Sequence, residues 1–236
     1  MGIAFVTLWV TGGILYTAWR FLQREPAPKK GTGFVIVSYL ACLLIWGVLT
    51  SLIAIEGGYV ATTEILSMNL ATFVPLVITG CFLLYPPSRQ VFEGWIASIS
   101  LREFLWIHLI RLAAIGTIIK MLRGTLPAHF IIPVGVPDFI LALSVPLMVW
   151  LAFRKRVIGR RALIAWNVIG FGLFLPALVL LHLSVPSPIR IFFDPPNTYE
   201  VFRFPMALVP SLLAPLFIII HNAAIVKLLR PGVSEG

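Results

Sequence analysis

The chain has 236 residues, of which 59% are hydrophobic and only 11% charged, and its mean hydropathy is +1.00. Since about a quarter of the residues in a soluble domain are charged, this composition excludes a surface covered with polar groups in water. The solvent must be largely lipid, where α-helices and closed barrels satisfy every backbone group. The apolar runs, about 18 to 26 residues long, lack the alternation of barrel strands. We therefore predict an all-α, polytopic transmembrane helix bundle.

The net charge of +9 and the pI near 10.2 would suggest a nucleic-acid partner in a soluble domain. In a membrane protein, lysine and arginine collect on cytoplasmic loops and set the orientation of the chain. We therefore expect the lipid bilayer as partner and no nucleic acid.

Seven apolar runs predict seven spans in a single transmembrane domain covering residues 1–236. The first run has no basic region before it and no small-residue cleavage site after it, so we expect a retained span and not a signal peptide. The spans lie at about residues 2–22, 34–55, 68–85, 104–122, 139–153, 163–183 and 206–229.

Basic residues on alternate sides of these spans predict the orientation, because the side richer in them faces the cytoplasm. The N-terminus is then outside and the C-terminus inside. The basic side holds Arg20, Arg24, Lys29, Lys30, Arg89, Arg102, Arg154, Lys155, Arg156, Arg160, Arg161, Lys227 and Arg230, and the other side holds Lys120, Arg123, Arg190 and Arg203.

The longest stretch between spans, about residues 184–205, mixes charged residues and prolines with aromatic residues. It includes Arg190, Asp194, Tyr199 and Phe202. Such a mixture is typical of a segment at the level of the lipid headgroups.

The fourth span carries His108 and Arg111, three residues apart and therefore on one helical face. A charge near the bilayer centre costs at least ~2.5 kcal/mol on insertion scales, so Arg111 should face the bundle interior and have a partner. Asp138 is the candidate, because the other carboxylates lie in loops or at a span end. Alternatively, Asp138 follows Pro137 at the start of the fifth span and stabilises that helix N-terminus.

The connection between these two spans, residues 124–137, is uncharged and rich in proline and glycine. An ordinary aqueous loop carries polar turn residues, so we expect a re-entrant or interfacial segment with non-helical backbone. Pro127, His129, Pro133 and Gly135 would then form a cavity wall. The alternative is a short interfacial loop packed on neighbouring helices.

The four histidines fall at two depths on this topology, His108 with His221 and His129 with His182. This placement suits a two-haem electron carrier, although four residues can also be so placed by chance. No C-x-x-C-H motif and no acidic metal cluster accompanies them, so structural histidines without a cofactor or metal are the other interpretation. His221 and Asn222 are expected to form hydrogen bonds between helices.

Motifs of several membrane and soluble enzymes are absent from the sequence. There is no G-x-S-x-G elbow, H-E-x-x-H motif or P-loop, and no pair of carboxylates within the spans. We therefore expect no hydrolytic chemistry and assign no catalytic residue.

Several residues of the second half resemble a group of bacterial seven-span membrane proteins without an assigned function. They are Arg111, Gly124, Leu126-Pro127, Phe130, Pro133, Gly135, Asp138, Trp166-Asn167, Pro210 and His221. The resemblance implies location in a bacterial inner membrane and brings no activity with it.

The leading functional hypothesis is a protein that binds, transports or senses a small molecule in a cavity within the bundle. Arg111 would anchor an anionic group, or else pair with Asp138. Two alternatives stay open: an accessory or scaffold subunit of a larger membrane complex or homo-oligomer, and a b-type haem electron carrier.

Overall fold

The computed structural model describes residues 2–24, 31–61, 65–185 and 188–230, with the backbone alone for residues 2–11, 24, 61, 65–69 and 199. Every regular element in this part of the chain is helical, as predicted. The α-helices are α1 (Gly2–Arg24), α2 (Thr32–Ile55), α3 (Gly58–Ala61), α4 (Ile65–Leu84), α5 (Pro86–Ser98), α6 (Leu101–Trp106), α7 (Ile115–Leu122), α8 (Ala128–Val149), α9 (Arg160–Gly172), α10 (Phe174–Ser184) and α11 (Ala214–Leu229). Two 3₁₀-helices, η1 (Ile107–Ala114) and η3 (Thr198–Phe202), and two π-helical segments, η2 (Trp150–Arg154) and η4 (Val209–Leu213), complete them.

Five continuous helices among the described residues are long and apolar enough to cross a membrane. They cover Thr32–Ile55, Leu101–Leu122, Ala128–Arg154, Arg160–Ser184 and Val209–Leu229. α4 and α5 give a sixth if they are counted as one span, although they meet at an angle of 108°. These helices coincide with six of the seven predicted runs, and α1 coincides with the remaining one.

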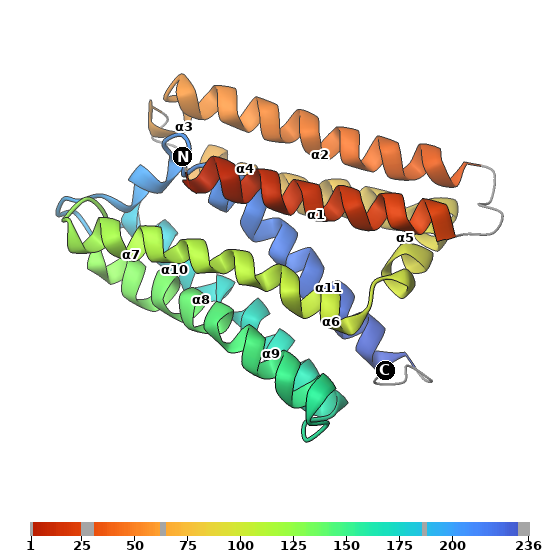
Figure 1. Cartoon of the computed structure of the whole chain (residues 1–236). Coiled ribbons are helices and arrows are strands. Elements are labelled where there is room, and N and C mark those ends of the chain that lie inside the picture. Colours follow the sequence, from red (N-terminus) through yellow and green to blue (C-terminus); the bar gives the residue numbers. More distant parts are fainter. Residues whose placement is uncertain (1, 25–30, 62–64, 186–187, 231–236) are drawn as a thin grey trace.

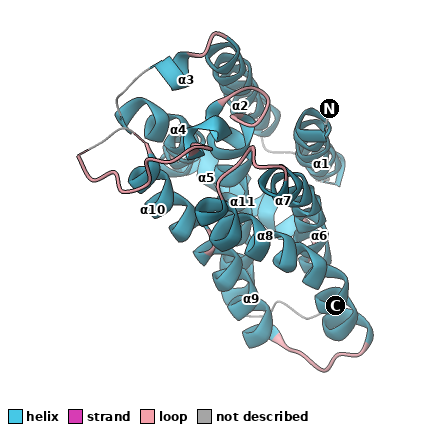
Figure 2. Ribbon diagram, turned by 90° about the vertical axis from the view of Figure 1, so that its left-hand side faces the viewer, coloured by secondary structure: helices cyan, strands magenta, loops and turns pink. Residues whose placement is uncertain are grey.

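The helices lie roughly along one direction, and the start of α1 and the end of α11 lie at opposite ends of the bundle (Figure 1). α11 crosses between α1 and α2 on one side and α8 and α9 on the other (Figure 1), and Figure 2 shows it surrounded by other helices. Half of the most apolar part of Val209–Leu229, the span that ends with α11, is buried, more than in any other of the five candidate spans. The residues that α11 turns inward therefore meet several helices at once.

The helix α5 was not predicted from the sequence. Tyr85 has an extended backbone, and the two prolines that follow it start the new helix at its first positions, where a missing N–H is harmless. Phe92 and Trp95 face the core, whereas Arg89 is exposed and pairs at 3.0 Å with the half-buried Glu93. An amphipathic helix at this sharp bend suits the edge of an apolar layer.

The helix α8 begins at Ala128, not near Phe139, which corrects the expected start of the fifth span. Of the segment expected to have non-helical backbone, only residues 124–127 lie outside a helix, and residues 128–137 belong to α8. Pro133, Pro137 and Pro146 all lie inside this helix. Proline is tolerated in membrane helices because neighbouring groups satisfy the freed carbonyls. Proline content alone therefore gave the wrong boundary.

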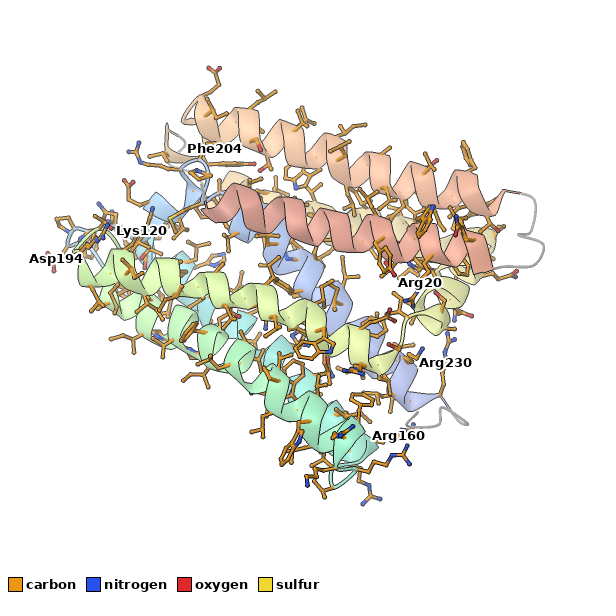
Figure 3. The ribbon with its side chains drawn as sticks, in the orientation of Figure 1. Arg20, Lys120, Arg160, Asp194, Phe204 and Arg230 are labelled. Carbon is orange, nitrogen blue, oxygen red and sulfur yellow. The ribbon has the colours of Figure 1, made fainter. Side chains whose placement is uncertain are left out.

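The ends of the bundle differ in charge. Arg20, Arg160 and Arg230 lie at one end, and Lys120, Asp194 and Phe204 at the other (Figure 3). Lys29 and Lys30, which are also predicted to lie at the basic end, are outside the described residues.

Two cross-helix contacts fix the basic end. Arg20 of α1 forms an ion pair with Glu103 of α6, whose carboxylate also completes a capping box with Ser100. Lys227 of α11 donates to the carbonyl groups at the end of α5, at 2.7 Å for Ala97. The carbonyls in the last turn of a helix lack the regular intrahelical donors, and within the described chain only that of Ile96 also accepts a backbone hydrogen bond, from Ile99 N–H. Lys227 therefore acts as a cap supplied by another helix.

At the opposite end, the segment from Pro188 to Met206 folds back on the bundle. Phe202 is fully buried in a cluster with Tyr59 and Phe130, and burial raises the pKa of the Tyr59 hydroxyl. Ile191 and Phe193 remain exposed. The mixed character predicted for this segment thus separates into a packed side and an exposed apolar side; the Tyr199 side chain lies outside the described residues.

Replacing Lys227 with methionine should lower the free energy of unfolding by about 1–3 kcal/mol, because it removes the donor from the Ala97 and Ile99 carbonyls at the end of α5. Thermal unfolding in a neutral detergent measures the change. The control is Arg102→Met, an exposed cation at the same end. Equal melting temperatures for the two variants would contradict the capping role.

Candidate functional site

Arg111 and His108 are placed by an unusual segment of the candidate span Leu101–Leu122, the fourth of the seven predicted spans. They belong to η1, a stretch of eight residues with 3₁₀ geometry between two α-helical segments. In a 3₁₀-helix, residues three apart lie directly above one another. Both side chains accordingly point into the bundle, where Arg111 is 3% and His108 0% exposed.

The Arg111 guanidinium meets one acidic, one imidazole and two aromatic neighbours. Asp138 Oδ1 of α8 lies 3.3 Å from Nε, and His221 Nε2 of α11 lies 3.3 Å from Nη1. The rings of Phe174 and Phe217 lie 5.0 and 4.6 Å from Cζ. The charge is therefore balanced by a carboxylate and covered by π-faces, the arrangement that a buried cation requires.

The protonation state of His221 follows from its partners. Arginine has no acceptor atom, so Nε2 of His221 must accept from Arg111 Nη1. Nδ1 then carries the proton and donates to Asn167 Oδ1 at 2.9 Å. Asn167 Nδ2 in turn donates to the carbonyl of Leu163 at 2.9 Å. His221 is thus a neutral imidazole held between a cation and an amide.

His108 stacks directly on His221, with ring centroids 4.1 Å apart and planes inclined by 15°. The Trp166 ring meets His108 edge-on at 5.4 Å and donates its Nε1 hydrogen to Ser144 Oγ at 2.8 Å. Neither ring nitrogen of His108 has a hydrogen-bond partner among the described residues. Polar atoms without partners are rare in protein interiors.

Arg111 also keeps donors without a partner. Nε and Nη2 are buried and make no hydrogen bond with the described part of the chain. The contact of Nε with Asp138 has the distance of an ion pair but not the geometry of a hydrogen bond. Nε and Nη2 form one edge of the guanidinium, the edge that binds a carboxylate or phosphate side-on with two hydrogen bonds.

Gly170 of α9 makes the close approach of His221 possible. A Cβ atom at Gly170 would lie 2.4 Å from His221 Cε1 and 3.0 Å from Leu141 Cδ2. Only glycine leaves this space open, so the position of the imidazole depends on it.

Of the residues selected from the sequence, the structure brings together Arg111, Asp138, His108 and His221. These four residues and Asn167 form the Arg111 cluster. Asp138 lies well inside α8, so the alternative of a helix cap at Pro137 is wrong. Asn222 is exposed and does not belong to the cluster, and the buried amide is Asn167 instead. Asn167 and Trp166 could have been selected, because both are residues with polar groups within the apolar run at 163–183. A single sequence does not show which way their side chains point.

The residues predicted to form a cavity wall do not line the Arg111 cluster. His129 contacts Thr198 Oγ1 at 3.2 Å and Ser184 Oγ at 3.3 Å, and it stacks on Phe192 at 3.9 Å. It therefore fastens the segment after α10 to α8. Gly135 is buried where α8 approaches Thr117 of α7, Pro127 is the buried residue before α8, and Pro133 is half-buried. These residues serve helix packing at the end of the bundle that holds Lys120 and Asp194.

The histidines do not fit a bis-histidine haem site. A porphyrin ligated by two imidazoles lies between them, and the stacked rings of His108 and His221 leave no such space. His182 contacts the Leu178 carbonyl of its own helix at 2.7 Å, whereas His129 contacts the segment after α10. The described residues contain no group of three or more His, Cys, Asp or Glu that could hold a metal ion.

A family model described as a domain of unknown function, DUF8737, matches residues 65–229. The chain belongs to this family. The matched range contains every residue of the Arg111 cluster, so the cluster lies within the part that the family model describes. Comparisons with curated proteins and with solved structures found no match.

Substituting Gly170 with alanine should destabilise the fold by about 1–3 kcal/mol, because the new methyl group overlaps the His221 ring. The matched control is Gly172→Ala in the same helix, where nothing lies within 4 Å of the added atom and alanine should be neutral or favourable. Comparing the thermal unfolding of the two variants measures the difference. Similar unfolding temperatures would mean that His221 is not fixed against α9.

Proposed function

We propose that this chain is a seven-span integral membrane protein of a bacterial inner membrane, with its N-terminus outside and its C-terminus in the cytoplasm. The start of α1 and the end of α11 lie at opposite ends of the bundle, as an odd number of crossings requires (Figure 1). α1 has 23 residues, the length of a span, and α4 with α5 supplies another crossing. The bacterial location rests on the resemblance given above.

Reporter fusions test this orientation. A C-terminal fusion to green fluorescent protein should fluoresce, because the C-terminus lies in the cytoplasm, and a C-terminal alkaline phosphatase fusion should be inactive. A phosphatase inserted after Asp194, at the opposite end, should be active. The reverse pattern would overturn the orientation, and equal activity at both sites would mean that the last helix does not cross the membrane and would overturn the proposed topology.

Within this protein, the Arg111 cluster is the binding site for a small molecule that carries a carboxylate or phosphate. The observation that carries this assignment is the buried Nε and Nη2 edge of Arg111, which no hydrogen bond from the described residues fills. A charged residue inside a membrane bundle is a functional site by default. An anion at this edge would supply the missing acceptors and a second negative charge next to the guanidinium.

Asp138 would compete with an incoming anion for the Arg111 guanidinium. Its side chain is 28% exposed whereas that of Arg111 is 1% exposed, so Asp138 is the partner through which the pair reaches the surface of the bundle. An incoming carboxylate must share or replace the contact between Asp138 and Nε. Such exchange gives the empty site an internal counter-ion and keeps it neutral, as transport or sensing of an anion within lipid requires.

The neighbouring groups favour an uncharged, partly aromatic body next to the anionic group. Phe174, Phe217 and Trp166 surround the guanidinium and the two imidazoles, and His108 presents two ring nitrogens without partners. A neutral imidazole can donate one hydrogen bond and accept another. The site thus combines the guanidinium group of Arg111, which can bind an anion, with aromatic rings and the unpaired ring nitrogens of His108, which can contact the rest of the molecule.

Thermal unfolding in detergent with acetate, benzoate or inorganic phosphate tests the assignment. A bound anion stabilises the folded state, by about 2.7 kcal/mol at a hundred times its dissociation constant. Asp138→Asn should increase the stabilisation by benzoate or phosphate, because the competing carboxylate is gone. Arg111→Leu should abolish it, and Arg111→Lys should weaken it by removing the two-pronged edge.

The response of Asp138→Asn separates binding from a structural ion pair. A structural pair predicts lower stability in this variant and no response to any of the three anions. That result, together with a partner protein recovered in equal amounts on purification in mild detergent, would favour the accessory-subunit alternative. Asn222→Ala, outside the cluster, is the control and should respond like the unmodified protein.

A further inference from the structure

The loop between η2 and α9 concentrates positive charge at one end of the bundle. Five of the eight residues from Arg154 to Arg161 are basic, and all five are exposed. The sequence has no acidic residue between Asp138 and Asp194, and among the described residues no carboxylate pairs with Arg154, Arg156 or Arg161. Arg160 lies at the lower tip of the bundle in Figure 3.

The loop has a defined conformation. Arg156 has φ 55°. The N–H of the next residue, Val157, donates to the carbonyl of Leu151, six residues earlier in the chain, at 3.1 Å. This is a left-handed helix cap, a position that glycine normally fills. Ile158 packs against the core cluster that includes Val149 and Leu163. The basic side chains are therefore displayed from a fixed turn.

Local energetics do not explain the basic residues at two of these places. An arginine in the left-handed region is strained where glycine is not. Arg160 and Arg161 open α9, although cations are unfavourable at the positive end of a helix dipole. Residues that break local rules commonly serve a function.

Apolar side chains are exposed beside the charges. Val157 is 67% exposed and Trp150 47% exposed, and Lys155 Nζ lies 5.3 Å from the Trp150 ring centroid. Tryptophan at this level is typical of the boundary between hydrocarbon and headgroups. The surface therefore presents cations and apolar groups together, which suits a lipid better than a dissolved anion or a nucleic acid.

We propose that residues 150–161 bind the headgroup of an anionic phospholipid, with the arginines on the phosphate and with Trp150 and Val157 against the acyl chains. This site is separate from the Arg111 cluster and depends only on the chain crossing a membrane. Basic clusters next to a membrane helix recognise anionic lipids in this way. The lipid would hold the loop, and with it the ends of α8 and α9, at the membrane surface.

Native mass spectrometry of the full chain in dodecyl maltoside micelles tests the proposal, with added phosphatidylglycerol or phosphatidylcholine. Phosphatidylglycerol should bind more tightly than phosphatidylcholine. Each arginine near an anionic headgroup contributes about fivefold in affinity, so Arg154→Gln with Arg156→Gln should weaken phosphatidylglycerol binding about 25-fold. Arg123→Gln, an exposed arginine at the other end, should leave it unchanged.

Arg156→Gly separates lipid binding from folding. Glycine relieves the strained backbone, so the unfolding temperature in neutral micelles should rise by about 2–4 °C, while phosphatidylglycerol affinity falls about fivefold. Equal phosphatidylglycerol affinity in the double variant and the unmodified protein would overturn the proposal. Full displacement of the lipid by millimolar inorganic phosphate would overturn it in favour of a site for free anions.

Discussion

The central constraint on this structure is the burial of one guanidinium group in an apolar bundle. Arg111 is 3% exposed, and a charge in such surroundings needs a counter-ion and acceptors. The groups that answer this need come from different helices: Asp138 from α8, His221 from α11 and, through His221, Asn167 from α9. One residue of η1 therefore fixes how three other helices face the centre.

Backbone departures from α-helix accompany this cluster. The 3₁₀ geometry of η1 aligns His108 with Arg111, so that one stacks on His221 while the other donates to it. In the last candidate span, the π-helical segment η4 precedes α11, and its extra residue per turn changes the rotation at which His221 arrives. Departures of both kinds are frequent at functional sites.

Composition and charge were enough to predict the helical class, the approximate positions of the long helices and Arg111 as the residue needing a partner. They also included Asp138 and His221 among the candidates. Asn167 was missed and Asn222 was chosen in its place, because an apolar run buried on most sides has no periodicity that reveals its inward face. Asn167 and Asn222 look alike in sequence, and only the packing of α9 on α11 distinguishes them.

The helix boundaries show a second limit. The prolines between 127 and 137 indicated a break, yet α8 continues through Pro133 and Pro137, whereas Pro86 and Pro87 do coincide with a sharp bend. A proline breaks a helix only if no neighbour compensates for the lost hydrogen bond and the clash. Whether a proline breaks a helix therefore depends on the packing around it, and the position of a proline in the sequence does not predict it.

The geometry of the pair between Arg111 and Asp138 bears on why a charged cluster is present. A buried ion pair contributes little net stability compared with apolar residues of similar volume, since desolvation offsets the attraction. A pair serving stability alone would be expected to use the side-on edge of the guanidinium fully, with two hydrogen bonds. Here Asp138 is displaced from that geometry and partly exposed. An ion pair that balances the buried charge while its guanidinium donors stay without acceptors is suited to exchange partners, and this geometry supports the proposed ligand site over a role in helix packing alone.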